Sequence, residues 1–102
     1  IGWAWALILS EIAPDRADAI QARGRNYGES RLVCNVHWQS DILEGRFMGA
    51  AAVARLHDNA AFQQDLLAAR REIAAARKAG QHSARDCAAE EAVLKVRPQS
   101  AL

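Results

Sequence analysis

The stretch Phe62–Ala76 reads FQQDLLAARREIAAA and repeats apolar residues at helical spacing. Leu66, Ala69 and Ile73 continue the series from Phe62 to Ala76 at intervals of four and three residues. This spacing places all five on one face of an α-helix, while the other face is charged. Because such a face needs a second helix to pack against, the stretch predicts an amphipathic helix inside an all-α protein.

The rest of the chain is predicted to be helical as well, because alanine is abundant and no alternating strand pattern is sustained. We expect helices over residues 2–12, 14–30, 36–57, 59–79 and 84–94. Packed together, they would form a helical bundle.

Residues that favour turns or caps are expected to set the helix ends. Asn35 is expected to cap the third helix, and Asp58 or Asn59 the fourth. Gly28 is expected to break the second helix, and Gly80 to end the fourth.

The third helix is expected to pack through one apolar stripe. The stripe consists of Leu43, Phe47, Ala50 and Ala54. His57 and His82 lie in charged, turn-like segments, so both are expected to be exposed.

The composition allows one small domain and excludes several function classes. The chain has 102 residues, of which 51% are hydrophobic and 25% charged, with a formal net charge of +1. This balance gives no electrostatic support for nucleic-acid binding. No apolar run approaches the roughly 18–20 residues needed for a membrane span.

The opening stretch Ile1–Leu9 is apolar on nearly all sides, which is typical of a helix surrounded by more protein. It has neither the basic segment nor the cleavage site of a signal peptide. We therefore expect residues 1–102 to be a single partial domain, the C-terminal part of a longer protein. Residues 95–102 are expected to be a frayed tail.

Three chemically reactive side chains lie within the segment SRLVCNVHWQSD, residues 30–41. Arg31 offers a planar fork of donors that matches phosphate oxygens. Asp41 lies four residues after His37, so its carboxylate can accept a bond from Nδ1–H and leave Nε2 free as a nucleophile. Phosphoryl transfer is the expected chemistry, and the simpler interpretation is an exposed His–Asp surface pair.

The pattern Ser30-Arg31-x5-His37-x3-Asp41 resembles the third signature of the PAP2 superfamily, S-R-x5-H-x3-D. The contexts CNVHWQSD and GRFMGAAAVARLH resemble the class A bacterial non-specific acid phosphatases more closely, from Ile1 to about Ala76. The resemblance implies a helical fold that hydrolyses phosphomonoesters without a metal or other cofactor.

The resemblance also implies a role for each matched residue. His37 would be the nucleophile that becomes phosphohistidine, Asp41 would orient it, and Arg31 would hold the oxygens of substrate and of product phosphate. Ser30 belongs to the signature without an assigned role. The family is usually periplasmic or secreted, which implies a signal peptide upstream, and it often forms homo-oligomers.

Two signatures of the family are absent from this chain: K-x6-R-P and P-S-G-H, whose histidine protonates the leaving group. The 102 residues would therefore hold the nucleophile and one arginine but lack the general acid. We expect the parent protein to be an acid phosphatase and this piece alone to be nearly inactive.

Other functions remain open on the sequence. A vanadium haloperoxidase or a lipid phosphatase shares the third signature. A non-catalytic helical interaction remnant would use the same helices without chemistry.

Cys34 and Cys87 are too few and too far apart for a zinc site or a disulfide scaffold. Both could be incidental thiols. A periplasmic location, which the resemblance implies, would allow one long-range disulfide between them.

Overall fold

The computed structural model describes residues 1–95, and within that range the side chain of Leu94 is left aside. The chain is all-α, as expected, with no strand in this range. The elements are α1 (Gly2–Ile12), the 3-10 helix η1 (Pro14–Arg16), α2 (Ala17–Val33), α3 (Gln39–Leu56), α4 (Ala60–Lys78) and α5 (Cys87–Lys95). Lys95, expected in the frayed tail, still belongs to α5, and the rest of that tail lies outside the described residues.

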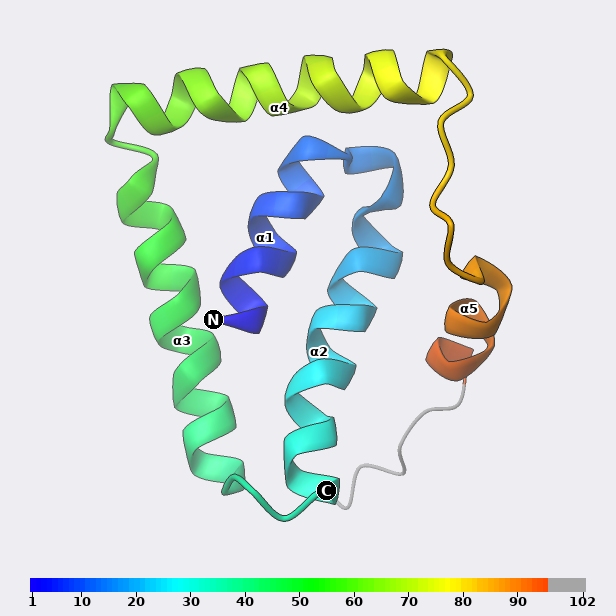
Figure 1. The fold of residues 1–102 in the computed structure, drawn as a ribbon. Helices are drawn as coiled ribbons and strands as arrows, with labels where there is room; N and C mark the ends of the chain where they lie inside the picture. The colour runs from blue at the N-terminus through cyan, green and yellow to red at the C-terminus, as the bar shows by residue number, and fades with distance from the viewer. Residues whose placement is uncertain (96–102) are drawn as a thin grey trace.

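Helices α1, α2 and α3 lie side by side, with α1 in the middle, and α4 crosses the end of this row (Figure 1). Helix α5 lies beside α2 on its outer side. The principal extents are 41 × 35 × 19 Å, and a helix with its side chains is about 10–12 Å wide. The protein is therefore little more than one layer of helices thick. None of the helices in residues 1–95 has the length and apolar character that a membrane crossing requires.

Two glycines let the neighbours of α1 approach it closely. A Cβ atom built on Gly24 of α2 would lie 2.5 Å from the Cβ of Ala6. A Cβ built on Gly49 of α3 would lie 3.3 Å from the backbone nitrogen of Ala4. Since real Cβ atoms do not approach at the first distance, α2 can take this position only with glycine at 24.

The buried core is small and consists mostly of small residues. Ala6, Ala13, Val53 and Leu66 are the buried hydrophobic residues among those described, each 4–9% exposed. Ser10 is buried as well, and its hydroxyl donates to the carbonyl of Ala6 at 2.7 Å. A single layer of helices encloses little volume, so most large apolar side chains stay partly exposed.

Both ends of α4 were correctly predicted from single capping residues in the sequence. The side chain of Asn59 accepts a hydrogen bond from the backbone N–H of Phe62 at 3.1 Å, which confirms the predicted N-cap. Gly80 follows α4 with φ of 69°, and its N–H bonds to the carbonyl of Arg77. This is the left-handed C-terminal cap that glycine favours.

The predicted break at Gly28 is wrong, because α2 continues through it to Val33. A Cβ on Gly28 would lie 3.2 Å from Ile42 of α3, so this glycine permits a close helix contact instead of ending a helix. Asn35 was also wrongly predicted as an N-cap. With φ of 54° it caps the end of α2, and the N–H of Val36 bonds back to the carbonyl of Arg31.

The apolar stripe predicted for α3 does not face the bundle. Leu43 is 46% exposed and Phe47 is 61% exposed. The face that packs contains Gly49 and Val53 instead, both buried against α1 and its neighbours. The close approach of Gly49 to Ala4 fixes how α3 is turned about its own axis. In that orientation the predicted stripe faces away from α1.

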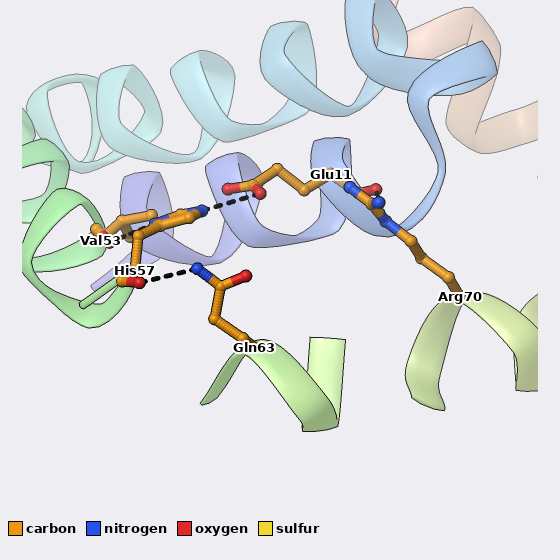
Figure 2. A network of polar contacts seen from close by, with 5 residues as sticks. All are labelled: Glu11, Val53, His57, Gln63 and Arg70. Atoms are coloured by element: carbon orange, nitrogen blue, oxygen red, sulfur yellow. Dashed lines mark hydrogen bonds and ion pairs between the residues drawn. The ribbon is translucent and has the colours of Figure 1, made fainter. Parts of the chain in front are cut away.

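His57, expected to be exposed, instead joins three helices at the end of α3 (Figure 2). Its Nδ1 donates to the carbonyl of Val53 at 2.8 Å, and its Nε2 donates to the carboxylate of Glu11 in α1 at 2.9 Å. Gln63 of α4 donates to the backbone carbonyl of His57, and Arg70 donates to that of Glu11, each at 2.7 Å. His82 lies exposed after α4, as expected.

The surroundings of His57 favour its charged form. Both ring nitrogens face an acceptor, which only the doubly protonated imidazolium satisfies. The pKa of His57 is raised above its ordinary 6.5, first by the hydrogen bond to Glu11 and then by the bond to the carbonyl of Val53. The carboxylate of Asp58 adds a smaller effect in the same direction.

We predict that the contact between His57 and Glu11 stabilises the fold in acid. Because the pKa in the folded state lies above the ordinary 6.5, the stabilisation is fully present below that pH and is lost as the pH rises through the raised pKa. The urea midpoint should therefore fall from pH 5.5 to pH 8.5 more in the wild-type chain than in His57→Gln. His82→Gln is the control and should keep the wild-type pH dependence. An equal loss in both variants would contradict the assignment.

Candidate functional site

All four signature residues lie at the junction between α2 and α3. Ser30 and Arg31 occupy the last turn of α2, His37 lies in the connecting segment, and Asp41 lies in the first turn of α3. The left-handed residue Asn35 reverses the chain between them. Figure 1 shows this junction at the end of the row opposite α4.

His37 and Asp41 form the contact that their spacing predicted. Nδ1 of His37 lies 3.2 Å from Oδ2 of Asp41, and the same oxygen accepts the backbone N–H of Trp38 at 3.2 Å. The second bond fixes the carboxylate at the start of α3. When Nδ1 carries the proton, the lone pair of a neutral imidazole is on Nε2, the nitrogen a nucleophile requires. The side chain of His37 is 50% exposed, and within the described residues Nε2 has no hydrogen-bond partner.

Arg31 is held by its neighbours on α2. The hydroxyl of Ser30 accepts from Nε and Nη2 of Arg31 at 3.2 and 3.1 Å, and donates to the carbonyl of Tyr27 at 2.7 Å. The guanidinium also lies 5.4 Å from the centroid of the Tyr27 ring, a cation–π distance. Ser30 therefore positions the arginine, and Nη1 is left for another acceptor.

The structure brings the four residues together as two pairs. His37 contacts Asp41, and Arg31 contacts Ser30. Within residues 1–95, no hydrogen bond or ion pair links one pair to the other. The arrangement offers an oriented, exposed imidazole and a half-buried guanidinium on one junction.

Two contributors to the site were missed from the sequence. Tyr27 lies four residues before Arg31, and this helical spacing could have identified it as the ring beneath the guanidinium. The backbone N–H of Trp38, which fixes Asp41, has no sequence signal of its own.

Neither of the other two histidines is placed beside His37 to act as its general acid. His57 is at the far end of α3, roughly 28 Å away at the 1.5 Å rise of an α-helix, and it is engaged by Glu11. His82 follows α4. In the described part of the chain, no group of three or more His, Cys, Asp or Glu residues is placed to hold a metal ion.

Cys34 and Cys87 are free, exposed thiols in the structure. The disulfide considered for them is therefore not formed here. Cys34 follows α2 at the site junction, whereas Cys87 begins α5.

Comparison with known proteins gives a consistent set of relatives, although no family model matches the chain. A non-specific acid phosphatase of Providencia stuartii is 49% identical over 78 residues, 76% of this chain and 32% of the relative. An acid phosphatase of Zymomonas mobilis is 47% identical over 77 residues, 76% of this chain and 29% of the relative. A non-specific acid phosphatase of Salmonella typhimurium is 47% identical over 68 residues, 67% of this chain and 27% of the relative.

The chain thus spans less than a third of the length of these curated relatives. Identities near one half over about 70 to 80 residues, in three bacteria, identify common descent for that part. About three quarters of this chain is homologous to part of the bacterial non-specific acid phosphatases.

Proposed function

We propose that this chain supplies the nucleophile of an acid phosphatase that hydrolyses phosphomonoesters through a phosphohistidine. The observation that carries the proposal is the contact of His37 with Asp41, which engages Nδ1 of a half-exposed imidazole and leaves Nε2 without a hydrogen-bond partner among the described residues. The matched relatives are acid phosphatases by name, which supports the same reaction class.

In the first step, Nε2 of His37 attacks phosphorus as the bond from phosphorus to the ester oxygen breaks. The imidazole gains positive charge, which the carboxylate of Asp41 stabilises at Nδ1–H. Arg31 neutralises charge on the phosphoryl oxygens through donors that Ser30 does not occupy. In the second step, water attacks phosphorus, the bond to nitrogen breaks, and phosphate and free His37 result.

The departing alcohol needs a proton, and the site built by these residues supplies none. A positioned general acid normally contributes about 10²–10⁴-fold in rate. We therefore infer that the 102 residues alone hydrolyse phosphomonoesters very slowly, and that the remaining catalytic groups come from polypeptide equivalent to the unmatched part of the relatives.

The first prediction concerns the chain by itself. With a chromogenic phosphomonoester at pH 5–6, we expect no turnover above that of a His37→Ala variant. Turnover that depends on His37 would show that the chain carries a general acid of its own, and it would overturn the inference of an incomplete site.

The second prediction concerns a chimera in which this chain replaces the matched segment of the Providencia stuartii enzyme. The chimera should hydrolyse phosphomonoesters, since it unites both parts of the site. His37→Ala should abolish turnover, and Asp41→Asn should lower kcat by about 10²–10⁴-fold, because the amide favours the wrong tautomer.

His82→Ala is the matched control in the chimera and should leave kcat unchanged. A burst of enzyme-bound phosphate after rapid acid-free quenching would identify the phosphohistidine directly. Full activity of His37→Ala in the chimera would contradict the assignment of the nucleophile.

We also propose that the native protein works in the periplasm or outside the cell, where a disulfide between Cys34 and Cys87 can form. Material purified from the periplasm should then gain two hydrogens in intact mass on reduction. Two free thiols in such oxidised material, matching the structure, would argue against the pairing.

A further inference from the structure

The chain exposes far more surface than a compact protein of its size. Its accessible surface is 8005 Å², whereas a compact monomer of this mass exposes roughly 5,700 Å². Its radius of gyration is 15.4 Å, against about 13 Å for a compact domain of 100 residues. Both values indicate helices that do not close around a single core.

Part of this surface is a continuous apolar face on α3. It is formed by Leu43, Phe47, Ala50 and Ala54, all exposed and spaced as a helix-packing stripe. The solvent-facing side of α4 is different: there the chain places polar residues such as Gln64 and Arg71. The stripe on α3 is therefore apolar, as a face packed against another helix would be, but it is exposed to solvent.

A second apolar opening lies between α1 and α2. Trp5, Leu9 and Tyr27 line a groove there and are 58%, 43% and 53% exposed. Folded domains normally cover such faces with a second layer of secondary structure. In residues 1–95, α4 and α5 cover the end and one edge of the row and leave these faces open.

The relatives provide a polypeptide that fits this requirement. More than two thirds of each relative has no counterpart in this chain, because the match covers 27–32% of their length. We propose that the stripe Leu43–Ala54 on α3 is the docking surface for polypeptide equivalent to that unmatched part. A transient partner would need one small face, whereas the two open apolar faces, on α3 and between α1 and α2, favour a piece of the same fold. This inference rests on the sequence match and the open faces, and not on the proposed reaction.

The test is to co-express this chain, tagged, with the unmatched part of the Providencia stuartii acid phosphatase. We expect a one-to-one complex on purification. Phe47→Lys should weaken it by about tenfold or more, because the complex would bury an unpaired charge. Gln64→Lys places the same charge on the polar side of α4 and should leave the complex intact. Circular dichroism of each variant alone should match the wild type, since both positions are exposed.

Three outcomes would overturn the docking proposal. Recovery of the tagged chain without the second polypeptide would do so, as would a complex equally sensitive to both variants. A stable homodimer that Phe47→Lys dissociates would assign the stripe to a second copy of the chain. Hydrolysis of a phosphomonoester is measured in the same samples: a complex that forms but does not turn over would overturn the proposed reaction and leave the docking surface standing.

Discussion

The arrangement of this protein depends on how closely α1 and its two neighbours can approach. At Gly24 and Gly49 no side chain stands between the helices, and the first of these positions has no room for even a methyl group. The central helix is consequently enclosed on two sides by helix backbones instead of by large side chains. This close packing directs α2 and α3 toward a common end, where five residues, Cys34 to Trp38, join them.

The reactive groups at this junction are oriented by contacts between residues that are close in the sequence. The left-handed cap at Asn35 and the carboxylate at the start of α3 are short-range structures, formed by residues within a few positions of one another. Contacts of this kind need little support from the rest of the fold. The chain can thus orient its imidazole in a single layer of helices, while completion of a catalytic site needs groups from elsewhere.

The same distinction separates what could be predicted from the sequence and what could not. The extent of α1, the cap at Asn59 and the turn at Gly80 follow from short-range signals, and the structure confirms them. The contact of His37 with Asp41 is of this class as well. The role of Gly28 and the rotation of α3 depend on contacts with other helices, and both predictions were wrong.

His57 illustrates the same limit, because its partner Glu11 is 46 positions away in the chain and no local pattern links them. For the site, the sequence indicated the residues, and the structure added the hydroxyl of Ser30 and the ring of Tyr27 as the supports of Arg31. The bond from Arg31 to Ser30 depends on the rotamer of the arginine, which the sequence does not give, whereas the helical spacing of Tyr27 to Arg31 was a signal that could have been used.

Helix α4 is attached to the row by contacts of a different kind from those within the row. It has one buried apolar residue, Leu66, and polar links from Arg70 to the carbonyl of Glu11 and from Arg77 to Asp15 at 3.0 Å. Exposed ion pairs are weakened by ionic strength, whereas sulfate strengthens apolar contacts. Concentrated ammonium sulfate therefore acts in opposite directions on the two parts: it tightens the row of α1, α2 and α3 and weakens the ion pair that holds the far end of α4.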